Sequence, residues 1–347
     1  MLILGIETSC DETAAAVIEN GPSTSSGLRI LSNVVASSVE LHQKTGGIIP
    51  EVAAREQLKC MLPVIQQAVQ SAKCKVQNLD AIAVTNGPGL IGSLLVGVET
   101  AKTLAYVWNK PLIPINHLQA HLYANWLEDK TPKFPAIGLV VSGGHTDLVL
   151  MENHGQIKWL GGTRDDAAGE CFDKAARVLG LGYPGGPAIS AEAEKLKTKN
   201  LKLKTELPRP MIKEENFDFS FSGLKTAVIN LTKNLKLKTK DRSLQSSVIN
   251  ALAFEIQEAI TDVLVTKTIR AAQKYQVKSI LLAGGVAANS RLREKFKLSI
   301  RHSPFVIFQP PPRLCTDNAA YIAACAYFNQ KFVPWEKVKV EPGLRIC

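Results

Sequence analysis

The stretch LILGIETSCDETAAAVIEN, residues 2–20, has the pattern of a strand, a polar turn and a second strand. A similar stretch, AIGLVVSGGHTDLVLMEN, occupies residues 136–153. At an offset of 133 residues the identical pairs are Gly5/Gly138, Ser9/Ser142, Thr13/Thr146, Glu19/Glu152 and Asn20/Asn153. We interpret this similarity as an internal duplication that gives two related lobes. The alternative is a coincidence between two unrelated hairpins.

Alternating strand and helix patterns follow each hairpin. In the first half, the predicted strands are 28–36, 81–85 and 112–115, and the predicted helices are 50–72, 90–108 and 117–127. In the second half, the strands are 157–160, 279–283 and 306–309, and the helices are 167–179, 246–275, one from Asn289 and one from Asp317. The pattern predicts an α/β fold of two lobes, each a mixed sheet flanked by helices, with a cleft between them. We place the N-terminal lobe at 1–130, the C-terminal lobe at 131–330 and a tail at 331–347.

The composition is that of an ordinary globular protein. Of 347 residues, 46% are apolar and 21% are charged, which excludes a disordered chain, a collagen and a coiled coil. The one long uncharged stretch, 81–98, contains Asn86-Gly87-Pro88-Gly89, so no membrane span and no membrane partner are expected. Seven scattered cysteines without a CxxC pair indicate a reducing cytoplasm. The net charge of +10 permits a polyanionic partner.

Much of this positive charge lies in a predicted insertion at about residues 190–242. Within it, residues 195–240 repeat Lys-Leu-Lys-Thr three times and hold 12 Lys and Arg against 4 Asp and Glu. The insertion is therefore either a solvated surface segment or a cationic surface for the phosphates of a nucleic acid.

Three glycine-rich turns follow predicted strands. The turn at 87–92 fits G-x-G-x-x-G, but Asn116 ends the next strand, where a dinucleotide-binding fold needs an acidic residue. This turn either presents backbone amides to an anion or is purely structural. In the turn at 142–146, Gly143 and Gly144 permit positive φ and close approach to a ligand. With a third turn at 283–289, the pattern predicts a nucleotide-like ligand.

The segment His117-Leu118-Gln119-Ala120-His121 places two imidazoles on one face of a predicted helix, which is the spacing of a metal-chelating pair. Leu118 stands where a zinc protease of the H-E-x-x-H type carries glutamate, so the pair indicates a metal but argues against that hydrolysis. The candidates for a third ligand are Asp317 and Asp166. The alternative is a pair of partly buried structural histidines.

Four carboxylates lie at the start of another predicted helix, within residues 165–174. Most of them fit the favourable electrostatics of a helix N-terminus. Asp173 lies one turn further on and is a candidate to accept hydrogen bonds from a ligand.

With these motifs assembled, the chain closely resembles the tRNA N6-adenosine threonylcarbamoyltransferase family, formerly described as O-sialoglycoprotein endopeptidases. The matching segments follow the family order over nearly the whole chain: 5–13, 46–51, 87–89, 117–121, 140–146, 163–174, 183–186, 219–225, 284–289 and 316–319. The Ser-Gly-Gly-His-Thr sequence at 142–146 is similar to that of the bacterial and organellar branch. The resemblance implies the duplicated fold of the sugar kinase, actin and heat-shock chaperone superfamily.

The resemblance also implies a reaction. The threonylcarbamoyl group of threonylcarbamoyl-adenylate passes to N6 of the adenosine beside the anticodon, at position 37, in tRNAs that read codons beginning with A. The implied ligands of an iron ion, with zinc as the alternative, are His117, His121 and Asp317. The implied substrate contacts are Val140, Val141, Ser142, Gly143, Gly144, Asp173, Gly186 and Asn289. Ser190 is a departure, because some members have an aspartate on the substrate at this position.

No single residue stands out as the general base, and the candidates are His145, Asp11 and Glu12. The partners that the resemblance implies are tRNA, threonylcarbamoyl-adenylate, a paralogous partner subunit and a small ATPase. Two other functions remain as alternatives. A metallopeptidase is disfavoured by Leu118, and a non-catalytic nucleotide-binding scaffold would have no use for the two histidines and the aspartate.

The basic insertion generates a first prediction. Replacing Lys195, Lys197, Lys202 and Lys204 with Glu should weaken tRNA binding and reduce the slope of log affinity against log salt by about three to four, because fewer phosphate counterions are released. Filter binding from low to high salt measures both quantities. The same four changes to Arg keep the charge and should leave both unchanged. An unaltered affinity and slope in the Glu variant would make the insertion a solvated segment.

Overall fold

The computed structural model describes residues 1–21, 27–196, 206–236, 242–301 and 303–347. The chain divides into two compact units. The first unit comprises 1–133, 153–157 and 310–347, and the second comprises 134–152 and 158–309. Residues 310–330 therefore belong to the first unit, whereas the sequence analysis placed them in the C-terminal lobe. The reason is that helix α10 (Ala320–Asn329) packs against strand β1 (Leu2–Glu7) and helix α4 (His117–Tyr123).

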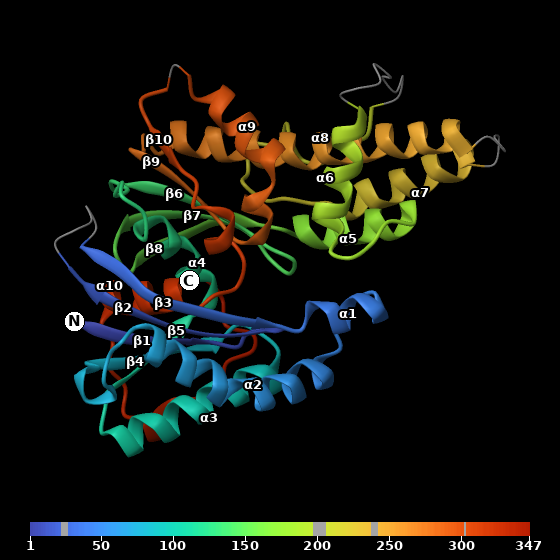
Figure 1. Ribbon diagram of the computed structural model, residues 1–347. Helices are drawn as coiled ribbons and strands as arrows, with labels where there is room; N and C mark the ends of the chain where they lie inside the picture. The colour runs from blue at the N-terminus through green and yellow to red at the C-terminus, as the bar shows by residue number, and fades with distance from the viewer. Residues whose placement is uncertain (22–26, 197–205, 237–241, 302) are drawn as a thin grey trace. The chain divides into compact units, whose positions relative to one another are not determined.

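The sheet of the first unit has the strand order β3-β2-β1-β4-β5 (Figure 1). Strand β1 pairs antiparallel with β2 (Glu12–Asn20), and β2 in turn pairs antiparallel with β3 (Leu28–Ser37). On the other side of β1, β4 (Ala81–Gly87) and β5 (Leu112–Asn116) run parallel to it. Helix α1 (Val39–Thr45), which the sequence analysis did not predict, follows β3.

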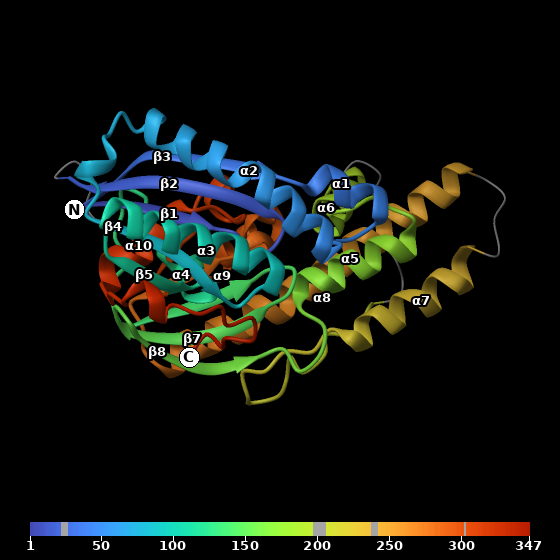
Figure 2. The same ribbon diagram turned by 90° about the horizontal axis from the view of Figure 1, so that it is seen from below.

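Opposite faces of this sheet carry different helices. Helices α2 (Pro50–Ser71) and α3 (Ile91–Trp108) lie side by side over one face, where Leu4 and Ile6 of β1 join their apolar core (Figure 2). The intervening residue, Gly5, faces α10 on the other side, as the alternation of a strand requires. A β-carbon at Gly5 would lie 2.4 Å from the carbonyl oxygen of Ala319, so only glycine allows this close approach.

The sheet of the second unit repeats that of the first, with the order β10-β9-β6-β7-β8. Its strands are β6 (Ala136–Val141), β7 (Thr146–Asn153), β8 (Gln156–Gly162), β9 (Ser279–Ala283) and β10 (Val306–Phe308). Ile3 pairs with Ile18 in the first sheet, and Ala136 pairs with Met151 in the second. Both partners are shifted by the same offset of 133 residues. Strands β4 and β9 each run parallel to the first strand of their hairpin. The predicted duplication is therefore confirmed in topology and in register.

The region predicted as an insertion contributes to the core of the second unit. Helix α6 (Gly185–Leu196) packs against the long helix α8 (Arg242–Lys274), and α7 (Ser222–Lys236) packs against α5 (Ala168–Leu179). The buried apolar side chains of this region include Ile189 and Ala193 of α6, Leu224 and Val228 of α7, and Phe219 and Phe221 just before α7. The described parts of this region thus include a packed, buried face, and the choice between a solvated segment and a cationic surface stays a prediction. The sequence analysis missed α6 and α7 because lysine-rich repeats begin at their C-terminal ends, at Lys195 and Lys236, and gave the whole region the composition of an insertion.

The predicted tail, 331–347, lies along the first unit and holds the start of α4. The side-chain amides of Asn116 and Gln119 donate to the carbonyl oxygens of Arg345 and Ile346, both at 2.7 Å. Among the described residues, no helix has both the length and the apolar composition that a membrane span requires.

The contact at Gly5 generates a second prediction. Gly5→Ala should lower the free energy of unfolding by about 1–3 kcal/mol, because α10 must move away from β1. Gly223→Ala is the matched control, since nothing lies within 4 Å of an added β-carbon there and a helical alanine should stabilise α7. Chemical denaturation measures both changes. Equal effects of the two substitutions would contradict the account of Gly5.

Candidate metal centre and substrate loops

The two histidines are positioned by a capped turn between β5 and α4. The side chain of Asn116 accepts hydrogen bonds from the backbone N–H groups of Leu118 and Gln119, at 2.9 and 3.1 Å, so the helix begins at His117. His117 and His121 then lie one turn apart on the same face. Both are buried, with 7% and 1% of their surface exposed.

Asp317 completes the cluster from a distant part of the chain. It lies three residues before α10, and its Oδ1 is 3.3 Å from His121 Nε2 and 3.7 Å from His117 Nε2. The two Nε2 atoms are 3.1 Å apart. The other candidate ligand, Asp166, pairs instead with Lys174 in the second unit at 2.5 Å.

The donor atoms of this cluster fit a metal ion. Ligands about 2.1 Å from an ion in tetrahedral or octahedral geometry lie about 3.0–3.4 Å apart, close to the separations of His117, His121 and Asp317. In the described part of the chain, His121 Nδ1 is buried without a hydrogen-bond partner, so Nε2 is the nitrogen that this ring directs at its neighbours. Two imidazoles and one carboxylate suit Fe(II) or Zn(II).

A buried carboxylate that the sequence analysis did not single out lies behind His117. Glu7, at the end of β1, is 0% exposed, and its Oε2 is 3.1 Å from His117 Nδ1. It also accepts hydrogen bonds from the hydroxyl of Thr85 and the backbone N–H of Ser9. A carboxylate on Nδ1 fixes the orientation of a metal-binding imidazole and leaves Nε2 for the ion. The sequence offered one signal for Glu7, because it is an acidic residue at the end of an otherwise apolar strand.

The electrostatics of the cluster favour a cation. Burial opposes the charged imidazolium, but Glu7 and Asp317 raise the pKa of His117 to about 9. Burial also opposes the charge of Asp317, yet His117 and His121 hold the pKa of that carboxyl well below its usual range. Burial and the charge of His117 lower the pKa of His121. The buried carboxylate of Glu7 and the half-buried carboxylate of Asp317 therefore face one imidazolium, which leaves negative charge for a metal to neutralise.

Tyr321 is a second residue that sequence reasoning missed. Its hydroxyl lies 3.3 Å from Asp317 Oδ1, and its ring is tilted against that of His121 with 4.6 Å between centroids. Tyr321 is fully buried on α10. Tyr321 follows Asp317 by four residues, which is one helical turn, so this spacing could have indicated that the two side chains meet.

Two of the three candidate bases lie where the turn after β1 enters β2: Asp11 is in the turn, and Glu12 is the first residue of β2. The side chain of Gln57 holds this turn through hydrogen bonds to the carbonyl oxygens of Cys10 and Glu12, both at 3.0 Å. Burial and the charges of Asp317 and Asp11 raise the pKa of Glu12 to about 10. In the metal-free protein Glu12 thus keeps its proton at neutral pH and is placed to donate a hydrogen bond.

The third candidate base, His145, lies in the equivalent turn of the second unit. Ser142 closes this turn, since its backbone N–H donates to the His145 carbonyl at 2.9 Å and its hydroxyl accepts from the His145 N–H at 3.1 Å. Gly143 and Gly144 are exposed, and β-carbons added there would meet nothing within 4 Å. Glycine permits a positive φ at these two positions, but neither residue adopts one, so what they provide is open space beside the backbone. Val140 and Val141 are buried in β6.

Positive φ occurs instead at the third glycine-rich turn. Gly284 has φ 86° and lies against the backbone of Val141, where a β-carbon would come within 2.3 Å of the carbonyl oxygen. The chain then enters α9 (Ser290–Ser299), which Asn289 caps. Asp173 lies elsewhere in the second unit, and its Oδ1 accepts from the backbone N–H of Gly185, beside the predicted contact Gly186.

The turn at 87–92 is occupied by protein rather than open to a ligand. Gly89 lies so close to Ser9 that a β-carbon would be 2.4 Å from its carbonyl oxygen, and Leu90 N donates to the same oxygen at 2.8 Å. Gly87 is packed equally closely against Glu341. The structural alternative therefore holds for this turn. Of the four lysines of the first prediction, Lys195 pairs with Glu192, and the other three lie outside the described residues.

Comparison with solved structures defines the class of fold. The chain is similar to component A of (R)-2-hydroxyglutaryl-CoA dehydratase of Acidaminococcus fermentans, with a TM-score of 0.52, 15% identity and coverage of 95% of this chain and 98% of that one. HypF of T. kodakarensis gives a TM-score of 0.56 and 16% identity over 95% of this chain and 47% of that one. This likeness, with the repeated sheets, confirms the predicted α/β fold of two related lobes, each a mixed sheet flanked by helices.

Sequence comparison defines the family. Residues 29–324 match the model of the family described as TsaD, tRNA N6-adenosine threonylcarbamoyltransferase. Proteins of that name from Syntrophomonas wolfei and Dehalococcoides mccartyi are 51% and 52% identical, over 96% and 95% of this chain and 94% of theirs. The chain belongs to the tRNA N6-adenosine threonylcarbamoyltransferase family and is a transferase that modifies tRNA.

The pKa of Glu12 generates a third prediction. The folded chain keeps a proton that the unfolded chain loses above its ordinary pKa of 4.5, so this contribution to stability is lost as the pH rises toward 10. The free energy of unfolding of the metal-free protein should fall from pH 5 to 9, with a slope of at most about 1.4 kcal/mol per pH unit from this group. Glu12→Gln should flatten the fall, whereas Glu51→Gln on the exposed side of α2 should not. Urea denaturation at each pH measures this, and parallel curves for wild type and Glu12→Gln would refute the assignment.

Proposed function

We propose that the chain transfers the threonylcarbamoyl group from threonylcarbamoyl-adenylate to N6 of adenosine 37, beside the anticodon, in tRNAs that read codons beginning with A. Membership of the family supports the transfer to tRNA. The proposed site rests on one observation: the buried His117 and His121 and the half-buried Asp317 form a cluster in which the three ligand atoms lie within 4.8 Å of one another.

The proposed metal ligands are these three residues, and the proposed metal is Fe²⁺, with Zn²⁺ as the alternative. When bound, the ion supplies Lewis-acid polarisation of an oxygen atom. Glu7 fixes the ring of His117 through Nδ1, and Tyr321 holds Asp317 through a hydrogen bond. These contacts restrict the ligands before the ion arrives, which preorganises the site.

The proposed transfer forms one bond and breaks one bond. The adenosine N6 attacks the carbamoyl carbon, the bond from that carbon to the phosphate oxygen breaks, and AMP leaves with the negative charge. The exposed backbone N–H groups of Gly143 and Gly144 and the hydroxyl of Ser142 are proposed to donate hydrogen bonds to this charge, since the Ser142 N–H already bonds the His145 carbonyl. Asp173, Gly186 and Asn289 are proposed to position the substrate, because a weak amine nucleophile depends on orientation.

The base that accepts the N6 proton is proposed to be Asp11 or His145. Glu12 is a poorer choice in the metal-free protein, since its raised pKa keeps it protonated. A cation held by His117, His121 and Asp317 would lower that pKa again, so Glu12 is proposed to become a candidate base only when the metal is bound.

The proposed partners, besides tRNA and threonylcarbamoyl-adenylate, are a paralogous subunit and a small ATPase. The surface we propose for the paralogous subunit is the pair α2 and α3, where Leu58, Leu62, Ile91 and Leu95 are exposed at i, i+4 spacing. The proposed location is the cytoplasm, where the tRNA substrate is.

The metal assignment generates a fourth prediction. Purified protein loaded with Fe²⁺ should hold about one equivalent, and His117→Ala/His121→Ala should hold none and lose transfer. Asp317→Asn should also lose the metal, whereas Asp166→Asn, the matched change at the rejected third ligand, should keep it. Elemental analysis after dialysis measures the content. Retention of one equivalent by the double histidine variant would show that the ion binds elsewhere.

The function itself is tested by nucleoside analysis. Depletion of this protein should remove N6-threonylcarbamoyladenosine from tRNAs that read codons beginning with A, and re-expression of the wild-type chain should restore it. Mass spectrometry of digested tRNA measures the modified nucleoside. An unchanged level in depleted cells would contradict the proposed function.

A further inference from the structure

The second unit contains a closed ring of hydrogen bonds among three uncharged side chains. Asn289 caps α9, and its Oδ1 accepts from the backbone N–H of Leu292 at 2.9 Å. This contact fixes which end of the amide carries the hydrogens. The Nδ2 of Asn289 therefore points away from α9 and donates to Ser190 Oγ and to Gln257 Oε1, both at 3.0 Å.

The third hydrogen bond of the ring, between Ser190 and Gln257, determines whether the Ser190 hydroxyl donates or accepts. Ser190 Oγ lies 2.8 Å from Gln257 Oε1. Because a carbonyl oxygen has no hydrogen, Ser190 must donate its single hydroxyl hydrogen to Gln257. Toward any further group, Ser190 Oγ can then act only as an acceptor.

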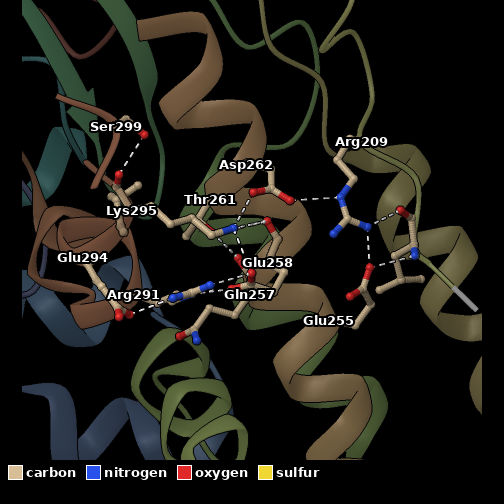
Figure 3. Close-up of polar contacts among 12 residues, drawn as sticks. Arg209, Glu255, Gln257, Glu258, Thr261, Asp262, Arg291, Glu294, Lys295 and Ser299 are labelled. Atoms are coloured by element: carbon tan, nitrogen blue, oxygen red, sulfur yellow. Dashed lines mark hydrogen bonds and ion pairs between the residues drawn. The ribbon is translucent and has the colours of Figure 1, made fainter. Parts of the chain in front are cut away.

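Burial and packing make this arrangement rigid. Gln257 is 5% exposed on α8, while Ser190 and Asn289 are half-buried and reach the surface. The residue after Gln257, Glu258, binds the guanidinium of Arg291 through two contacts of 2.6 and 2.9 Å. Figure 3 shows Arg291 and Lys295 of α9 converging on Glu258 of α8, with the amide of Gln257 beside them. These ion pairs hold the start of α9, and with it Asn289, against α8.

We propose that Gln257 is a positioning residue that makes Ser190 an acceptor-only group, which receives a hydrogen bond from a hydroxyl of the donor substrate. A carboxylate would also be acceptor-only, so the pair of Gln257 and Ser190 gives the hydrogen-bonding polarity of a carboxylate without its charge. The inference rests on the proposed function, since it takes threonylcarbamoyl-adenylate as the ligand. That molecule offers hydroxyls on its ribose and on its threonyl side chain, and the test separates these two sources.

The test measures discrimination between hydroxyl-bearing and hydroxyl-lacking ligands. The probes are a hydrolysis-resistant analogue of threonylcarbamoyl-adenylate, its 2′-deoxy and 3′-deoxy forms, and a form with 2-aminobutyrate in place of threonine. Calorimetry with the full, metal-loaded chain gives each dissociation constant. The wild type should bind one of the three altered forms about tenfold more weakly than the parent, and that form identifies the hydroxyl.

The variants decide the role of Gln257. Gln257→Met keeps the volume but removes the acceptor, so the tenfold discrimination should fall below about twofold. Gln257→Glu keeps an acceptor oxygen and should retain the discrimination. Ser190→Ala should remove it, and the Ser190→Ala/Gln257→Met double variant should lose nothing more. Thr261→Val is the matched control, because it removes a buried hydroxyl one turn along α8 that bonds the backbone of Gln257 at 2.7 Å, and discrimination should persist.

Each result bears on the proposal. If the wild type binds none of the probes, the proposed donor substrate is wrong and the inference falls with it. If the wild type binds all the probes equally, or if Gln257→Met or Ser190→Ala discriminates as the wild type does, the inference alone is overturned. If Gln257→Met fails to fold, loss of discrimination in Ser190→Ala with retention in Gln257→Glu supports the proposal, and the opposite pattern refutes it.

Discussion

The fully buried carboxylate of Glu7 is the constraint on which the first unit depends. An ionised carboxylate without water is costly unless several donors satisfy it. Here the donors come from three places: the turn after β1 through Ser9, the end of β4 through Thr85, and the start of α4 through His117. The carboxyl ends of two parallel strands and the N-terminus of a helix must therefore meet at one point.

That meeting point sets the rest of the candidate metal centre. His117 is fixed through Nδ1, and His121 follows one helical turn later, so both Nε2 atoms face Asp317. Asp317 reaches them because α10 packs on β1 at Gly5, where the absence of a side chain allows backbone contact. The tail closes the arrangement by holding Asn116 and Gln119 at the start of α4. The site thus combines residues from the beginning, the middle and the end of the chain.

Much of this could be predicted from the sequence because strong periodicity and spacing encode it. The duplicated hairpins, the strands of both sheets and the convergence of His117 and His121 all follow from local patterns. The partnership of Glu7 with His117 could not be predicted, since it joins residues 110 positions apart through the order of the strands. The return of residues 310–330 to the first unit depends on the packing of α10, which no local pattern specifies. Helices α6 and α7 were missed because lysine-rich repeats begin at their C-terminal ends and dominate the composition of the region, although Ile189 and Val228 belong to a buried face.

The central claim is that Glu7 orients His117 so that both histidines present Nε2 to a metal ion. The most direct measurement is the ¹⁵N NMR spectrum of the histidine side chains in the protein loaded with Zn²⁺, which is diamagnetic. The account predicts that His117 and His121 both carry hydrogen on Nδ1 and have the shifts of metal-bound nitrogen on Nε2. It also predicts that Glu7→Gln alters the His117 signals more than those of His121. Coordination of His117 through Nδ1, or imidazole signals that do not change when zinc is added, would contradict the account.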